Sequence, residues 1–443
     1  MSYIAVQDIA TYHSARPAPK WLDRFRTRAA ERFSQIDWPT PRDEEWRRTP
    51  LRTIDFDSYS IADNGAAGDT ALEAGNRPTG QSRFSIGETA GTVHVRNGSV
   101  VWTDLSEQAG MAGVRFGSAT SLLAEYPELA SDVEDLLERY LDASDNRLQL
   151  WHASLLGDAV LLYVPGNVEL SSPFVVEALS FGDVAATASA VIVIVADGAR
   201  VQMIRRTGSG SDGEALLLDG TIASVGANAS LSLTEIQDAN DESLLFSHGA
   251  ARVARDARLD RTEIHAGGDL VKARFVVDIT GPGADVNLNG AYCATEAQHI
   301  DLRTVQNHAA PHSTSRAFYK GAVREEAHSI YQGLIRVAPE APGTDAYLTN
   351  NNLVLSDSAR ADSIPSLNIA IDDVRCSHGS TTGKLDENQL FYLRSRGWTE
   401  EEARKTLIEA FFEEVISLTP VQVHEVVREL VAARMIADAE DDE

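Results

Sequence analysis

A thiol, an imidazole and a glycine–lysine pair lie close together near the carboxy terminus, in the stretch RCSHGSTTGK of residues 375–384. Cys376 and His378 are two positions apart. On a β-strand both side chains would therefore point to the same face and could approach one iron ion. The alternative is structural, with Cys376 as a small buried apolar residue and His378 as a turn residue bonded to the backbone. The residues alone leave both interpretations open.

The glycine–lysine pair does not fit a phosphate-binding loop. Such a loop has four residues between its glycines and a Ser or Thr after the lysine, whose hydroxyl reaches magnesium. Only three residues separate Gly379 from Gly383, and Leu385 follows Lys384. We therefore expect this chain to bind no nucleotide.

The cysteines and histidines offer few other metal sites. Cys293 and Cys376 are the only cysteines, whereas a self-contained iron–sulfur cluster usually takes four thiolates. Four histidines within thirty residues have spacings that fit no metal motif (His299, His308, His312 and His328). We expect these histidines to be structural, and any metal chemistry to need other ligand types or a partner chain.

The composition is that of an ordinary globular protein. The 443 residues are 43% apolar and 24% charged, which allows two or three domains and a large core. A formal charge of -27 disfavours binding to nucleic acid or to an anionic membrane. The amino terminus lacks the basic and apolar segments of a signal peptide, and the longest apolar run is only strand length. We expect a cytoplasmic protein with neither a nucleic-acid nor a membrane partner.

Three regions follow one another along the chain. Residues 1–147 carry helical spacing, interrupted near residues 61–85 by a small, polar stretch that we expect to be a flexible loop. Residues 148–385 consist of short runs rich in Val, Ile, Leu and Thr, separated by Gly, Asp and Asn, which predicts strands. Residues 386–443 return to helical patterns and form a carboxy-terminal helical domain.

The helix boundaries in this last domain are well marked. Asp386 can cap the first helix, and Thr399 with Glu402 forms a capping box for the second. Pro420 is expected at the first position of the third helix. The predicted apolar face of the second helix consists of Ala403, Leu407, Ala410, Phe411, Val415 and Leu418. We expect these helices to form a compact bundle docked at the end of the strand region.

A loose repeat occurs within the strand region. An alanine followed two positions later by a branched apolar residue recurs at steps of 30, 28 and 27 residues (Ala199 and Val201, Ala229 and Leu231, Ala257 and Leu259, Ala284 and Val286). Steps of this size without crossover helices favour a β-solenoid, in which each coil buries its inward side chains against the next. A β-sandwich is the alternative, because sandwiches also have evenly spaced turns.

Several stretches of the chain resemble a known protein family. Residues 372–397, DDVRCSHGSTTGKLDENQLFYLRSRG, resemble the carboxy-terminal signature of the SufB/SufD family of iron–sulfur cluster assembly proteins. The similarity extends backward through residues 344–369, 299–333 and 161–170. Residues 41–51, PRDEEWRRTPL, look like the SufD branch, and Ala359 aligns with a position where SufB-like chains carry a cysteine.

The resemblance implies a fold, a role and partners. It implies a right-handed parallel β-helix core flanked by amino-terminal and carboxy-terminal helical regions. It further implies a non-catalytic, SufD-like scaffold of a SufBCD complex, which pairs with a SufB-like subunit through the β-helix and binds a SufC-like ATPase through the carboxy-terminal helices. When alone, such a chain could form a homodimer. The cargo would be iron or an iron–sulfur cluster, held transiently and shared with the partner subunit.

Two alternatives stay open. One is a SufB-like cluster scaffold proper, against which the missing cysteine at Ala359 argues. The other, from a different class, is a carbohydrate-active β-helix enzyme with acid and base carboxylates along a groove.

The resemblance also implies roles for individual residues. A histidine at the position of His378 lies at the SufB interface of the family and is implicated in cluster assembly, with Cys376 as a second candidate ligand. The short helix that contains Leu390 and Tyr392 lies near the ATPase. On this helix Arg394 and Arg396 are the better contact candidates, because the planar guanidinium is favoured at interfaces. Leu390, Phe391 and Leu393 are instead expected to pack the helices together, at least in part.

Overall fold

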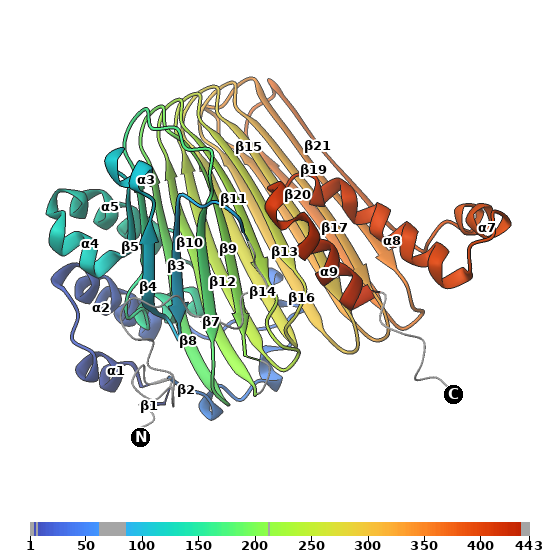
Figure 1. Cartoon of the computed structure of the whole chain (residues 1–443), viewed down its shortest axis with the longest axis horizontal. Helices are drawn as coiled ribbons and strands as arrows, with labels where there is room; N and C mark the ends of the chain where they lie inside the picture. Colours follow the sequence, from blue (N-terminus) through green and yellow to red (C-terminus); the bar gives the residue numbers. More distant parts are fainter. Residues whose placement is uncertain (1–3, 6–7, 62–85, 211–212, 436–443) are drawn as a thin grey trace.

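The chain winds back and forth between two sheets (Figure 1). The computed structural model describes residues 4–5, 8–61, 86–210 and 213–435. From β7 (Phe174–Ser180) to β21 (Val374–Gly383), consecutive strands alternate between the two sheets. From β9 onward, each strand pairs in parallel with the strand two positions earlier. This arrangement is a parallel β-solenoid, so the β-helix expectation is confirmed and the sandwich alternative is wrong.

The two sheets are named by their strands. Sheet A comprises, in spatial order, β1 (Ile4–Ala5), β2 (Ser60–Ile61), β8 (Ala185–Val195), β10 (Ala215–Val225), β12 (Leu244–Val253), β14 (Leu270–Ile279), β16 (His299–His308), β18 (His328–Val337) and β20 (Arg360–Ile369), with β5 (Arg115–Ser118) pairing with β6 (Val160–Val164) and β6 with β8. Sheet B comprises β21, β19 (Thr344–Val354), β17 (Thr314–Val323), β15 (Asp285–Ala294), β13 (Arg258–His265), β11 (Ser230–Gln237), β9 (Arg200–Ser209), β7, β3 (Gly91–Arg96) and β4 (Ser99–Leu105).

The repeated residues found in the sequence lie opposite one another on neighbouring strands of sheet B. Leu231 lies opposite both Val201 and Leu259, and Leu259 lies opposite Val286. All four side chains are buried in the solenoid interior. Burial of such a side chain contributes roughly 1.5–3 kcal/mol, so the column they form is a main stabilising element of the coils.

Helices from the amino-terminal region cover the outer face of sheet A (Figure 1). They are α1 (Ile9–Ala15), α2 (Lys20–Gln35), α4 (Ala119–Glu125), α5 (Ala130–Asp142) and α6 (Arg147–Ser154). As predicted, Pro127 separates α4 from α5. The same region also contains a short helix, α3 (Glu107–Met111), and supplies strands β3, β4 and β5. The loop expected near residues 61–85 lies, apart from Ile61, outside the described residues.

The carboxy-terminal helices begin where the sequence predicts. The Asp386 side chain accepts hydrogen bonds at the start of α7 (Glu387–Ser395), and the capping box of Thr399 and Glu402 begins α8 (Glu400–Ile416). Pro420 is not the first residue of a helix, because a short 3-10 turn (Val421–Val423) intervenes before α9 (His424–Met435). None of the described helices is both long enough and apolar enough to cross a bilayer.

The position of the helical bundle differs from the expectation. Helices α8 and α9 lie along the outer face of sheet B, over β15 and β17, and not at the end of the solenoid (Figure 1). The α8 side chains buried there are Ala403, Ile408, Phe412, Val415 and Ile416, whereas the predicted Leu418 is 49% exposed. Adjacent apolar pairs make α8 apolar on two neighbouring stripes, so periodicity could not choose between them.

Candidate metal and partner-binding site

The stretch that contains Cys376 and His378 forms the last strand of the solenoid. Among the described strands, β21 pairs only with β19, and β20 pairs only with β18. These two strands form the last coil, here called the open end, because no further described coil stacks on it (Figure 1). The sequence RCSHGSTTGK is therefore neither a nucleotide loop nor a turn but an edge strand.

Cys376 and His378 both lie on the inward face of β21. Cys376 is in register with Ala346, and His378 is in register with Leu348. Both β19 residues point into the interior and are buried. The two-residue spacing thus places the thiol and the imidazole on one face, as predicted, with Cα atoms about 7 Å apart. His378 is exposed, whereas Cys376 is half-buried and packs against the core.

The two cysteines have different environments. Cys293 points outward from β15 and is 1% exposed beneath the carboxy-terminal helices. Burial raises the pKa of the Cys293 thiol strongly. Burial, with a smaller contribution from Asp345, also raises the pKa of the Cys376 thiol. Cys376 is therefore protonated at neutral pH, and a metal ion bound by its sulfur would displace the proton. No group of three or more His, Cys, Asp or Glu in the described part of the chain is arranged to hold a metal.

The histidines between residues 299 and 328 make local contacts. The rings of His299 and His328 meet edge to face with centroids 5.1 Å apart. His308 bonds the hydroxyls of Ser313 and Ser315. Burial lowers the pKa of both His299 and His308 to about 4, so they are neutral at physiological pH. These contacts agree with a structural role.

The open end also has an apolar part that the sequence analysis did not single out. Leu367 and Ile369 of β20 are in register with Ile335 and Val337, whose side chains are buried in the interior. Leu367 is nevertheless 38% exposed and Ile369 37% exposed. The alternating pattern of β20 could have revealed this apolar face, but only the tertiary structure shows that it is uncovered.

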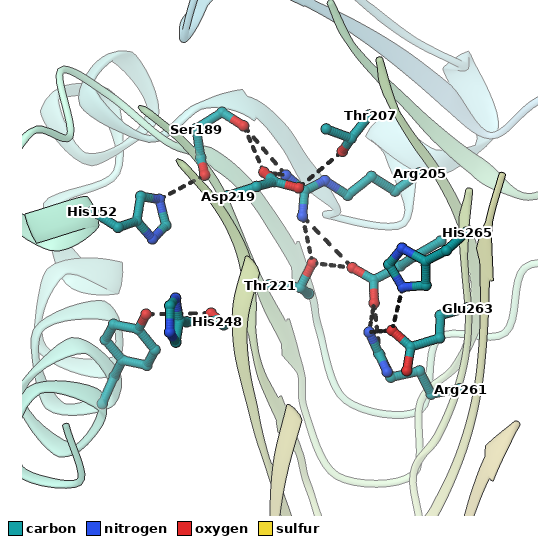
Figure 2. Close-up of polar contacts among 12 residues, drawn as sticks. His152, Ser189, Arg205, Thr207, Asp219, Thr221, His248, Arg261, Glu263 and His265 are labelled. Atoms are coloured by element: carbon teal, nitrogen blue, oxygen red, sulfur yellow. Dashed lines mark hydrogen bonds and ion pairs between the residues drawn. The ribbon is translucent and has the colours of Figure 1, made fainter. Parts of the chain in front are cut away.

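Charged side chains run through the interior of the solenoid (Figure 2). Asp219 pairs with Arg205 and accepts hydrogen bonds from Ser189 and Thr207. Arg205 in turn donates to Thr221 over 2.9 Å. The chain of contacts then continues from Thr221 to Glu235 (2.5 Å), from Arg261 to Glu235 (2.6 Å) and Glu263 (3.0 Å), and from Tyr319 to Glu263 (2.6 Å).

Opposite charges within this interior chain offset the effect of burial on Arg261 and Glu263. Burial alone would lower the pKa of Arg261, but Glu235 and Glu263 outweigh it and raise that pKa. Burial alone would raise the pKa of Glu263, but Arg261 and His265 outweigh it and lower that pKa. Arg261 and Glu263 are therefore charged inside the solenoid. Arg261 and Glu263 lie two and four positions after Leu259 on the same strand, so their side chains point to the same, inward face. Extending the repeat by these positions would have predicted from the sequence that both charged residues are buried.

The proposed docking helix α7 extends away from the sheets (Figure 1). Leu390 is 5% exposed and packs within the bundle, so it cannot contact a partner directly. Phe391 and Tyr392 are 74% and 57% exposed. Arg394 forms an ion pair with Glu400, and the Arg396 guanidinium lies 5.2 Å from the centre of the Tyr392 ring. The exposed surface of α7 and its C-cap residue Arg396 thus combines two aromatic rings with two arginines.

Comparisons with known proteins match almost the whole chain. Residues 178–411 match the family described as "SUF system FeS cluster assembly, SufBD core domain", and residues 2–176 match the "SufBD protein N-terminal region". An iron–sulfur cluster assembly SufBD family protein of Mycobacterium leprae is 39% identical over 53% of this chain and 60% of its own length. The iron–sulfur cluster assembly protein SufD of Escherichia coli is 32% identical over 54% of this chain and 56% of its own length. SufD of Bacillus subtilis is 23% identical over 94% of both chains. The first two matches therefore span little more than half of each relative.

Proposed function

Because the chain belongs to the SufBD family of the SUF iron–sulfur cluster assembly system, we propose that it is a SufD-type scaffold subunit. It pairs with a SufB-like subunit through the open end of the solenoid and docks a SufC-like ATPase through α7. It performs no bond-breaking chemistry itself and passes iron or a nascent cluster at an interface shared with its partner. The observation that carries the proposal is the uncovered last coil, which combines apolar side chains with Cys376 and His378.

The open end has the features of a pairing surface. The outer edges of β20 and β21 present backbone groups that could pair with another sheet. The inward side chains Leu367 and Ile369 continue the core columns but are partly exposed. A partner solenoid with coils of the same dimensions would cover these side chains and continue both sheets. For this reason we expect the partner to belong to the same family.

Replacing Leu367 by Glu is expected to abolish pairing with a co-expressed SufB-like subunit. The substitution would force a carboxylate into the apolar centre of the interface, where an unpaired charge costs several kcal/mol. Size-exclusion chromatography with light scattering would show the two subunits eluting separately.

The matched control is Val101→Glu, at a residue that is 41% exposed on β4, the opposite edge strand of sheet B. This variant should pair normally. If Leu367→Glu pairs as well as Val101→Glu, the open end is not the interface. If the wild-type chain forms only homodimers beside a SufB-like subunit, the heterodimer proposal is wrong.

In this proposal Cys376 and His378 contribute ligands at the interface. Together they offer one sulfur and one nitrogen donor from one face, and iron accepts both types. A cluster or iron ion needs further ligands, which we assign to the partner subunit. The metal is cargo here, and the two side chains hold it only while the subunits are paired.

His378→Ala is expected to lower cluster formation on the assembled complex at least tenfold while leaving folding and pairing intact, because the side chain is exposed and contributes little packing. The measurement is iron and sulfide bound per complex after anaerobic reconstitution. The neighbouring Ser377→Ala is the control, since Ser377 lies on the opposite face of β21. Equal cluster yields in the two variants would place the site elsewhere.

A further inference from the structure

A cavity of about 270 Å³ lies between α5 and the outer face of sheet A, away from α7 and lined by no residue of the open end. Helix α5 forms one wall with Leu136, Arg139 and Tyr140, together with its C-cap residue Ala143, and the floor consists of residues from β10 to β18. Small-molecule sites usually occupy roughly 300–1,000 Å³, so this cavity suits a small ligand and not a macromolecule.

The floor of the cavity is amphipathic. Ala250, Val276 and Val305 are in register on neighbouring strands and form an apolar strip. On one side of this strip lies a row of polar residues, each in register with the next, on four neighbouring strands (Arg252, Asp278, Asn307 and Arg336). On the first three strands these residues come two positions after the residues of the strip. On the other side lie His248 and Arg274, again in register. A ligand on this floor would meet an apolar centre between two polar borders.

The cavity is electropositive, although the chain carries a formal charge of -27. Four arginines line it against two carboxylates, Asp145 and Asp278. Arg274 is held by Asp145 and Glu45. The other three, Arg139, Arg252 and Arg336, form no ion pair with any described residue, whereas most arginines of this chain do. Three guanidinium groups around one cavity are therefore available to an anion.

Buried polar atoms at the cavity also lack partners within the described chain. His248 is 3% exposed, and its Nδ1 atom makes no hydrogen bond. The Asn307 Oδ1 atom is likewise unbonded, while its amide nitrogen donates to Asp278. An unsatisfied buried polar atom destabilises the folded chain. A bound molecule with its own polar groups would remove that destabilisation.

We propose that this cavity binds a small organic anion whose phosphate or carboxylate groups pair with Arg252, Arg336 and Arg139 and whose apolar part lies on the strip of Ala250, Val276 and Val305. Guanidinium groups bind both anions through charge-assisted, bidentate hydrogen bonds. This site is separate from the pairing, docking and cargo surfaces described above, so its occupancy can be tested on the chain alone.

The test is isothermal titration of the full chain at low ionic strength with two probes that each carry an apolar ring, phenyl phosphate for organic phosphates and phthalate for organic carboxylates. We expect at least one to bind with a dissociation constant below 1 mM. The double variant Arg252→Ala, Arg336→Ala should weaken that binding at least tenfold. Both side chains are exposed, so the fold should persist.

The matched control is the double variant Arg258→Ala, Arg316→Ala, which removes the same charge from an exposed and a half-buried position on sheet B. It should change the affinity less than twofold. A third variant, Ala250→Phe, fills the apolar strip and should also weaken binding at least tenfold. The proposal is overturned if neither probe binds the wild-type chain at 1 mM, or if the control weakens binding as much as the cavity variant.

Discussion

Replacing Phe391 and Tyr392 together by alanine is expected to release a SufC-like ATPase from the complex, with at least a 100-fold loss of affinity. Large aromatic side chains at an interface commonly cost about 2 kcal/mol or more each when truncated. Both rings are exposed on α7, so their removal should leave the chain's own melting temperature unchanged. Light scattering on co-expressed subunits should show a complex that has lost one ATPase and kept the SufB-like partner.

The control uses apolar residues of comparable exposure outside α7. Leu418 and Val421 are 49% and 74% exposed in the segment after α8. The variant Leu418→Ala, Val421→Ala should retain the ATPase. If that control also loses it, the docking surface is broader than α7, and if the α7 variant retains it, α7 is not the docking helix.

Deleting all carboxy-terminal helices would be a poorer experiment than these substitutions. Helices α8 and α9 cover Cys293 and Ala322 on the outer face of sheet B. A chain truncated before Asp386 would expose this apolar surface and would be prone to aggregation. Loss of the ATPase would then not be distinguishable from loss of the fold.

Arg261→Met is expected to destabilise the chain by about 3–5 kcal/mol. The substitution removes the cation that Glu235 and Glu263 share and leaves them the contacts with Arg205 at 3.6 Å and His265 at 3.0 Å. Breaking a buried ion pair by removing one partner carries a penalty of that size. The free energy of unfolding in urea measures the effect. Arg258→Met, an exposed ion-pair residue on the same strand, should change that free energy by only about 0.5 kcal/mol.

The same network predicts a pH dependence. The pKa of Glu263 is lower in the folded chain than its ordinary value of 4.5. Its contribution to stability is therefore fully present above pH 4.5 and decreases as the pH falls below that value. In the Arg261→Met variant the loss of stability at acid pH that Glu263 causes should be smaller, because Arg261 is the first of the groups that lower the Glu263 pKa. If Arg261→Met lowers the free energy of unfolding in urea by less than about 1 kcal/mol, the interior charges are not a stabilising network.

Several features of this protein could be predicted from local sequence alone. The capping box of Thr399 and Glu402 and the Asp386 cap depend only on neighbouring residues, and both are formed. The repeat through Val201, Leu231 and Leu259 depends on a constant coil length, because equal coils keep equivalent residues in register. The common face of Cys376 and His378 follows from the period of a strand.

The tertiary structure decided which of these surfaces are covered. Periodicity identified an apolar helix at residues 400–416 but could not specify whether Ile408 or Leu418 would be buried, because that depends on where the helix meets sheet B. It could not show that Leu367 is left uncovered, since an inward residue has the same sequence pattern in the last coil as in any other. The charged interior and the arginine-lined cavity arise in the same way. Many of their members are far apart in the chain, such as Glu263 and Tyr319 or Asn307 and Arg336, and the stacking of coils brings them together. Local sequence determined the strands, caps and faces, whereas the stacking order determined which faces meet each other and which meet solvent.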